Sequence, residues 1–346
     1  MVSENYIKKT HTNIIKGVAL IFMFVHHFFT FPERIVCGVN YENIEVFSIY
    51  FHDALKICVP IFAFLTGYFY FFNKNKNYRY SFKKSTDLYI NYLVIFALML
   101  VTDFLLQCYE FGIKDVILEL LLLRTPNMEF CWYVLFFIFV MFCMPLFAKI
   151  ADKNSVIAFS VGVVLPTVII YILNCLGEVE TFRRFDTVFD VIKYISWFPS
   201  VASGYIFAKD NLFQKMHECN VKSKFVTIVM CFAYMLLPFV ARNQSASFDF
   251  IYAPLFIFGL VEIIDMIPNI KVLLPLSIIG KYSLLMWFIH SIFFNVSKEF
   301  TQPILYYPHN AILVTLWGLI MCLLASVILT YPINVLIKLK NKIFRL

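Results

Sequence analysis

The sequence predicts an all-α polytopic membrane protein of about ten transmembrane helices, with both termini in the cytoplasm. Its 346 residues are 61% hydrophobic and only 15% charged, and their mean hydropathy is +0.78. A soluble domain of this length needs more charge to cover its surface. Apolar runs recur along the chain, each long enough to span about 30 Å of hydrocarbon, and Lys and Arg gather in alternate connections between them.

The apolar runs follow one another without a dividing linker, so we expect a single transmembrane domain over residues 1–346. The first run is interpreted as a retained helix, because no small-residue cleavage site follows it. The stretch Val116–Leu123 is apolar but too short to span, which indicates an interfacial or re-entrant segment. The ten expected spans are Ile14–Phe31, Phe51–Phe72, Leu88–Gln107, Cys131–Ile150, Val156–Leu176, Val191–Ala208, Phe225–Ala241, Phe250–Pro268, Leu273–Val296 and Asn310–Ile337.

The basic residues orient these spans. With the N-terminus in the cytoplasm, the cytoplasmic connections hold roughly twice as many Lys and Arg residues as the outer ones, as the positive-inside rule requires. The outer connections are acidic instead, with residues such as Glu42, Glu45 and Glu178. Membrane orientation therefore accounts for the net charge of +7, and we expect membrane lipid, not nucleic acid, as a partner. The expected location is the cell (plasma) membrane.

The first expected helix carries a stripe of polar residues. Lys16 and His27 are eleven residues apart, almost three turns at 3.6 residues per turn, so they share a face, with Asn13 close to the same stripe. At a rise of about 1.5 Å per residue, His27 lies roughly 16 Å deeper than Lys16 and near mid-membrane. His26 points about a quarter turn away.

Two histidines at that depth require an explanation, because ionisable groups there normally face a partner or a cavity. One interpretation is structural: a neighbouring helix satisfies the rings by hydrogen bonding. The other is functional: His27 or His26 lines a polar cavity and accepts a proton. Imidazole suits this role because its pKa lies near neutrality and desolvation favours the neutral ring.

The spacing of Asn13, Lys16 and His27 resembles the opening motif of the acyltransferase 3 family of membrane O-acyltransferases, Asp-x-x-Arg-x10-His. This register assigns His27, not His26, to the family histidine. The chain departs from the motif twice. Asn13 replaces the acidic residue, and Lys16 replaces the arginine, which keeps the positive charge but loses the bidentate fork.

Two further segments resemble helices of the same family. Val59–Tyr68 is similar to its second helix, although a Pro kink with a small-residue contact at Gly67 explains the segment equally well. Cys131–Phe136, which contains Trp132, is similar to the start of a later helix. An interfacial aromatic anchor also explains Trp132.

The segment Gly280–His290 resembles a conserved stretch near the C-terminus of the family. Ser283 and His290 are seven residues apart, two helical turns, and therefore share a face. The resemblance leaves two roles for His290. It either forms a structural hydrogen bond or completes the cavity that holds His27.

A basic cytoplasmic loop containing Arg79, Lys83 and Lys84 is expected after the second span, where the family has clustered arginines. Positive-inside orientation alone would explain these charges. The functional alternative is that they hold the phosphates of a cytosolic acyl-CoA.

The resemblance implies an enzyme that transfers an acyl group, usually acetyl, from a coenzyme A thioester to a hydroxyl of a cell-surface or lipid-linked glycan. His27 would remove the acceptor proton, and Lys16 would stabilise negative charge on the donor. Acyl-CoA (acetyl-CoA) is then the donor substrate, with no permanently bound cofactor. No metal is expected, because no His, Asp and Glu cluster has ligand spacing.

The alternative function is a transporter or flippase of a glycan or small molecule that uses the intramembrane histidines for proton coupling. The series of family-like segments favours the enzyme. The identity of the acceptor, the choice between acetyl and succinyl, and the oligomeric state stay open at this stage.

Overall fold

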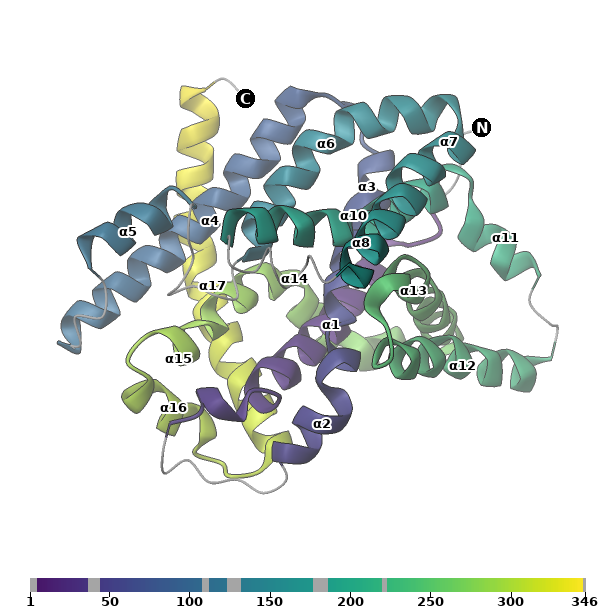
Figure 1. Ribbon diagram of the computed structural model, residues 1–346. Coiled ribbons are helices and arrows are strands. Elements are labelled where there is room, and N and C mark those ends of the chain that lie inside the picture. Colours follow the sequence, from purple (N-terminus) through teal and green to yellow (C-terminus); the bar gives the residue numbers. More distant parts are fainter. Residues whose placement is uncertain are drawn as a thin grey trace. The chain divides into compact units, whose positions relative to one another are not determined.

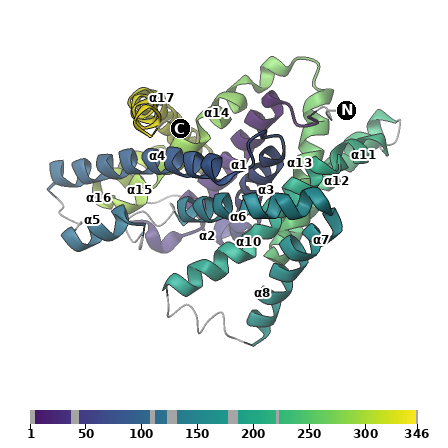
Figure 2. The ribbon, with the colours of Figure 1, turned by 90° about the horizontal axis from the view of Figure 1, so that it is seen from above.

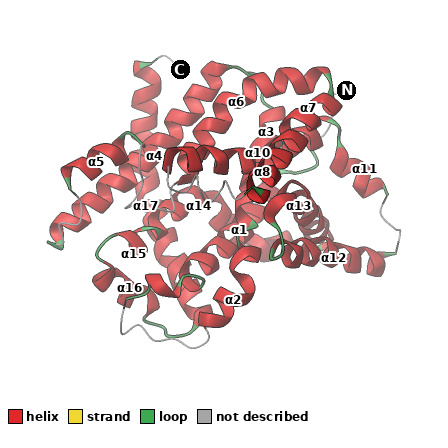
Figure 3. Cartoon of the chain, viewed as in Figure 1, coloured by secondary structure: helices red, strands yellow, loops and turns green. Residues whose placement is uncertain are grey.

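The computed structural model describes residues 5–36, 44–107, 112–122, 132–176, 186–219 and 223–344. Every regular element within these ranges is a helix, and none is a strand (Figure 3). The longer helices, labelled in Figure 1, are α1 (Lys9–Phe29), α2 (Ile44–Leu55), α3 (Cys58–Phe71), α4 (Tyr78–Leu105), α6 (Tyr133–Lys153), α8 (Leu165–Cys175), α10 (Asp186–Lys209), α12 (Lys224–Arg242), α13 (Asp249–Met266), α14 (Leu274–His290) and α17 (Ala311–Ile343).

Shorter helical elements connect these helices. A π-helical turn, η3 (Ser160–Val164), joins α7 (Ser155–Phe159) to α8. The remaining short elements are η1 (Pro32–Arg34), α5 (Ile113–Leu120), α11 (Leu212–Glu218), η4 (Ala246–Phe248), η5 (Ile270–Leu273), α15 (Ile292–Asn295) and α16 (Lys298–Tyr306).

Nine helical stretches of the described chain are long and apolar enough to cross a membrane. They coincide with nine of the ten expected spans, which confirms the all-α polytopic fold. The tenth expected span, Val191–Ala208, lies in α10, which does not reach the same apolarity. The reason is local: Ser200 and Ser203 are buried in protein, 1% and 3% exposed, so this part of α10 need not present apolar side chains to lipid.

The chain forms two compact units, and each is assembled from separate stretches of sequence. The first unit comprises Met1–Phe22, His52–Tyr78 and Phe142–Gly280, and the second comprises Met23–Phe51, Arg79–Met141 and Lys281–Leu346. Helices such as α1, α6 and α14 begin in one unit and end in the other. A single domain over residues 1–346 stays a prediction.

In the first unit, α3 and α10 touch backbone to backbone. A Cβ atom on Gly67 would lie 1.9 Å from the Val201 carbonyl oxygen, and one on Gly204 would lie 2.1 Å from that of Phe64. Glycine permits such a close approach of two helices, and the contact is then held by dispersion forces over many atoms. The small-residue contact expected at Gly67 is therefore present. Helices α12 and α13 lie side by side in the same unit, as both views show (Figures 1 and 2).

A second glycine contact in the first unit joins α1 to α14. A Cβ atom on Gly280 would lie 1.7 Å from the Asn13 carbonyl oxygen, and one on Gly17 would lie 2.3 Å from the Leu276 carbonyl oxygen. The two helix backbones therefore meet at a point where neither helix has a side chain. This contact fixes the starting halves of the two helices that carry the sequence motifs.

The segment before α1 is held by Glu262 of α13. The Tyr6 hydroxyl and the His217 Nδ1 atom, the latter at 2.6 Å, both contact the Glu262 carboxylate, which is buried. The Tyr6 ring also stacks on Phe213 and Phe258. Burial, with the hydrogen bond to Glu262, raises the pKa of Tyr6 above its usual value, so the phenol remains a donor. The chain therefore enters α1 from a fixed position.

In the second unit, α5 lies against α4. The Tyr92 hydroxyl donates to the Glu119 carboxylate at 2.8 Å, and the Tyr89 hydroxyl donates to the Leu120 carbonyl. With eight residues, α5 is about 12 Å long and does not cross a membrane. The short apolar stretch that begins at Val116 is thus a packed, non-spanning helix, as its length indicated.

The last helix of the second unit is longer than a membrane is thick. The 33 residues of α17 extend about 50 Å, whereas the hydrocarbon core measures about 30 Å. At its basic end, the Lys340 ammonium lies 2.5 Å from the Asp87 carboxylate and 3.0 Å from the Thr86 hydroxyl of α4. This ion pair links the end of α17 to the basic start of α4.

We expect Gly280→Ala to lower the free energy of unfolding by about 1–3 kcal/mol, because the added methyl group forces two backbones apart. Denaturation of the purified protein by sodium dodecyl sulfate, followed by circular dichroism, measures this. Gly112→Ala is the control, since its Cβ atom would meet only the flexible Asp115 carboxylate at 3.1 Å. Equal stability of the two variants would show that the α1–α14 contact tolerates a side chain.

Candidate functional site

A hydrogen bond between two histidines joins α1 and α14 in the second unit. The Nδ1 atom of His27 lies 2.6 Å from the Nε2 atom of His290, and the ring planes differ by 13°. Rings stacked face to face approach each other only to about 3.5 Å. The two imidazoles therefore meet edge to edge, nitrogen to nitrogen, in one hydrogen bond.

The end of α14 explains how His290 is held. In a continuing helix, the Trp287 carbonyl would accept the amide hydrogen of Ser291, four residues later. Here the Ser291 amide donates to the Phe288 carbonyl instead. The Trp287 carbonyl accepts the Nδ1 hydrogen of His290, a donor from the same helix turn.

The two rings differ in exposure. His290 is fully buried, and the Phe24 ring lies beside it with 5.4 Å between the ring centroids. His27 is only half-buried. His27 therefore retains some exposed surface, whereas His290 is enclosed by protein.

Each unit contains one close contact between α1 and α14. In the first unit, Gly17 and Gly280 lie where the backbones meet, and in the second unit His27 and His290 share their hydrogen bond. In both pairs the second residue comes 263 positions after the first. The two contacts therefore pair residues of α1 and α14 at the same separation along the chain.

His26 has a local partner. The Thr30 hydroxyl donates to the His26 carbonyl at 2.7 Å, and its oxygen lies 3.0 Å from the His26 Nδ1 atom. Because the hydroxyl hydrogen is directed to the carbonyl, the Nδ1 atom of His26 is the donor of the second bond. The ring is buried and packs edge-on against Phe31. His26 therefore caps its own helix end, while His27 contacts His290.

Trp132 and Ser283 occupy different surroundings in the second unit. The Trp132 ring packs against Tyr133, and the Tyr133 ring packs against Trp287 with 4.7 Å between centroids. These three rings connect the start of α6 to the carbonyl-bearing residue that holds His290. Ser283 is buried, two turns before His290 on α14.

Asn13 and Lys16 are both half-buried residues of α1. The helix is continuous from Lys9 to Phe29, so the eleven-residue spacing between Lys16 and His27 is helical, as expected. The part of α1 that holds Asn13 and Lys16 belongs to the first unit, and His27 belongs to the second.

The expectation of a basic loop at Arg79, Lys83 and Lys84 is wrong. All three residues lie in the first turns of α4, which begins at Tyr78, ten residues before the expected span. The hydropathy pattern marks only the apolar part of a helix, and this helix continues beyond that part on the polar side. Arg79 and Lys84 are exposed, Lys83 is half-buried, and the Lys84 ammonium lies 5.7 Å from the centre of the Tyr80 ring.

Sequence reasoning missed the group that orients His290. The Trp287 carbonyl is a backbone atom, and only the position of the helix end makes it an acceptor for a side chain. It also missed Tyr92 and Glu119, a buried pair from two elements. A buried carboxyl on a short apolar segment was the available signal for Glu119. Within the described ranges, no three His, Cys, Asp or Glu side chains are grouped to hold a metal ion.

Comparison with protein families agrees with these motifs. The family model described as an acyltransferase domain matches residues 12–331, nearly the whole chain. No curated protein and no solved structure matches the chain. The matched range includes the polar stripe of α1, the basic start of α4 and the His290 segment of α14. The chain therefore belongs to the acyltransferase 3 family and is a multi-pass membrane acyltransferase.

Proposed function

We propose that this acyltransferase moves an acetyl group from acetyl-CoA to a hydroxyl of a cell-surface or lipid-linked glycan. The observation that supports this best is the hydrogen-bonded sequence from His27 through His290 to the Trp287 carbonyl. A half-exposed imidazole that is oriented by a second, buried group is the arrangement that general-base catalysis requires.

The three hydrogen-bonding groups determine where the protons lie. A carbonyl oxygen only accepts, so the Nδ1 atom of His290 carries a hydrogen and donates to Trp287. In a neutral ring, the Nε2 atom of His290 then has a lone pair, and it faces the Nδ1 atom of His27. His27 Nδ1 is therefore the donor between the rings, and the lone pair of a neutral His27 ring is on Nε2.

The proposed reaction uses that lone pair. The Nε2 atom of His27 takes the proton of the acceptor hydroxyl as its oxygen attacks the thioester carbonyl carbon. The new C–O bond forms, the C–S bond breaks, and the coenzyme A thiolate leaves and takes up the proton. While His27 is protonated, the lone pair of His290 Nε2 stabilises it through the Nδ1 hydrogen.

Basic residues are proposed to bind the donor. Arg79, Lys83 and Lys84 lie in two successive turns of α4, and the exposed Arg79 and Lys84, with the half-buried Lys83, are proposed to contact the phosphates of a cytosolic acyl-CoA. Lys16, with Asn13 one turn before it, is proposed to stabilise negative charge on the donor at the cytoplasmic mouth of the site, about three turns from His27.

Three further residues are assigned supporting roles, and the protein is placed in the plasma membrane. His26 is proposed to hold the end of α1 through Thr30. Trp132 and Ser283 are proposed to line the acyl path near Trp287 and along α14. The large exposed apolar side chains of α8, α12 and α17 are suited to contact with lipid.

Replacing His27 with Ala should abolish acetyl transfer and acetyl-CoA hydrolysis, a loss of about 10²- to 10⁴-fold for a general base. The assay follows release of the coenzyme A thiol by purified protein in lipid nanodiscs. His26→Gln is the matched control and should retain most of the activity, because its amide can still donate to Thr30. Full activity of His27→Ala together with loss in His26→Gln would reverse the assignment. Substrate transport without thiol release would support a transporter.

Replacing His290 with Leu should lower kcat by about tenfold to a hundredfold and leave the KM for acetyl-CoA unchanged, because His290 orients the base and does not bind the donor. His290→Gln should recover part of kcat, since its amide oxygen can accept from His27 Nδ1. Nitrogen NMR of histidine-labelled protein should show the hydrogen of neutral His27 on Nδ1. A hydrogen on Nε2 of His27 would contradict the proposed proton arrangement.

Replacing Arg79, Lys83 or Lys84 with Gln should raise the KM for acetyl-CoA about two- to fivefold for each charge removed, with little change in kcat. The effect should fall as salt is added, because exposed charges are screened. Lys298→Gln, at the start of α16, is the control for removal of a charge elsewhere. Unchanged KM values in all three variants would remove these residues from the donor site.

A further inference from the structure

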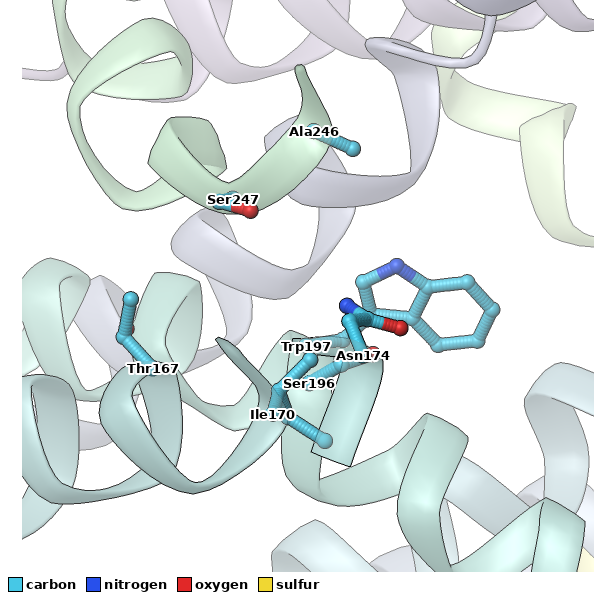
Figure 4. A pocket seen from close by; sticks show the side chains of 7 residues that line it. All are labelled: Thr167, Ile170, Asn174, Ser196, Trp197, Ala246 and Ser247. Atoms are coloured by element: carbon cyan, nitrogen blue, oxygen red, sulfur yellow. The ribbon is translucent and has the colours of Figure 1, made fainter. Parts of the chain in front are cut away.

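The first unit contains a cavity of about 290 Å³ between the end of α8, the middle of α10 and the turn η4 (Figure 4). Trp197 of α10, Asn174 of α8 and Ser247 of η4 all line it, and Figure 4 shows Ser247 on a different element from the other two. Small-molecule sites in proteins begin at about 300 Å³. The cavity therefore has room for a single ring with its substituents.

The side chains around the cavity combine one aromatic surface with uncharged hydrogen-bonding groups. Trp197 provides a flat apolar face, and it is half-buried, so the ring remains accessible. The Asn174 amide offers both donors and an acceptor, and the hydroxyls of Ser196 and Ser247 add further groups. The Thr167 hydroxyl donates to the Val163 carbonyl, so it can accept from a ligand.

None of the seven lining residues is charged. An anionic ligand such as coenzyme A would meet no cation among these described residues, and burying its charge against them would be costly. A hydrocarbon chain would leave the amide and hydroxyls without partners, which also costs free energy. A neutral ring with several hydroxyls satisfies both requirements, since its apolar face covers the indole and its hydroxyls reach the polar groups.

Two of the polar residues that line the cavity, Asn174 and Ser247, lie at or between helix ends. Asn174 is the residue before the last of α8, and Ser247 belongs to the turn between α12 and α13. In the orientation predicted from Lys and Arg, both positions are on the outer side of the membrane. A water-soluble ligand can therefore reach them without crossing hydrocarbon.

We infer that this cavity binds a neutral sugar ring. This inference rests on the proposed function, under which the ring is a unit of the acceptor glycan. The unit that contains the cavity contains neither His27 nor His290. The sugar site and the acyl-transfer site are then separable by mutation, because their residues belong to different units.

The test is saturation-transfer NMR with methyl glucoside and methyl N-acetylglucosaminide on the full chain in phosphatidylcholine nanodiscs, free of sugar detergents. Wild-type protein should bind at least one glycoside, and Trp197→Ala should raise its Kd about tenfold or more. Asn174→Ala, at an exposed position, should also weaken binding. Trp317→Ala is the control, because its indole donates to the Ile304 carbonyl and Trp317 is not one of the residues that line the cavity. His27→Ala should bind as wild type does.

Three results would overturn the inference: no binding of either glycoside to wild type, unchanged binding in both Trp197→Ala and Asn174→Ala, or tighter binding of glucuronate than of the neutral sugars. Thiol release from acetyl-CoA is measured in parallel without any acceptor. Trp197→Ala should leave this hydrolysis unchanged. If Trp197→Ala loses sugar binding but still hydrolyses acetyl-CoA, the sugar site is supported independently of the proposed acyl-transfer chemistry. If the wild type hydrolyses acetyl-CoA but binds neither glycoside, only the sugar site is contradicted.

Discussion

The close approach of α1 and α14 is the constraint on which the candidate site depends. In the first unit, Gly17 and Gly280 remove the side chains that would hold the two backbones apart. In the second unit, the same register brings His27 to within hydrogen-bond distance of His290. Because side-chain positions on a helix are fixed by its backbone, the backbone contact and the histidine contact require the same helix register. Membrane helices gain little from hydrophobic association, so such close packing must hold them together.

In the hydrogen bond between His27 and His290, a third group determines which ring is the donor and which is the acceptor. Two imidazoles can share a hydrogen in either direction, and neither direction is favoured by the rings themselves. The carbonyl of Trp287 removes that choice, because it accepts and never donates. Burial of His290 makes an unsatisfied nitrogen costly, so the arrangement is maintained. His27, at the more exposed end, is the ring that has its lone pair directed away from the pair.

The basic residues at the start of α4 and the uncharged residues around the cavity belong to different units of the chain. Arg79, Lys83 and Lys84 lie in the first turns of α4 in the second unit, whereas the seven described residues that line the cavity beside Trp197 in the first unit are all uncharged. Under the proposed function, the residues assigned to an anionic donor are therefore different from those assigned to a neutral acceptor.

The choice of His27 over His26 as the base stays a prediction. Hydropathy and the family-like segments were sufficient to predict the family, the helical class and nine of the spans, because lipid imposes a length and an apolarity on each helix that local sequence records. They failed at Arg79, Lys83 and Lys84, since the polar end of a helix has no hydropathy signal. They also gave two roles for His290 without choosing between them. Only the tertiary structure identified the hydrogen-bond partners of His290. The Trp287 carbonyl can accept from its side chain because α14 ends at His290, and His27 is 263 residues away along the chain. Sequence alone determined which segments could be buried in a membrane. Tertiary structure decided which of their residues are in contact, because a contact between helices that are distant in sequence depends on packing, which no local sequence pattern contains.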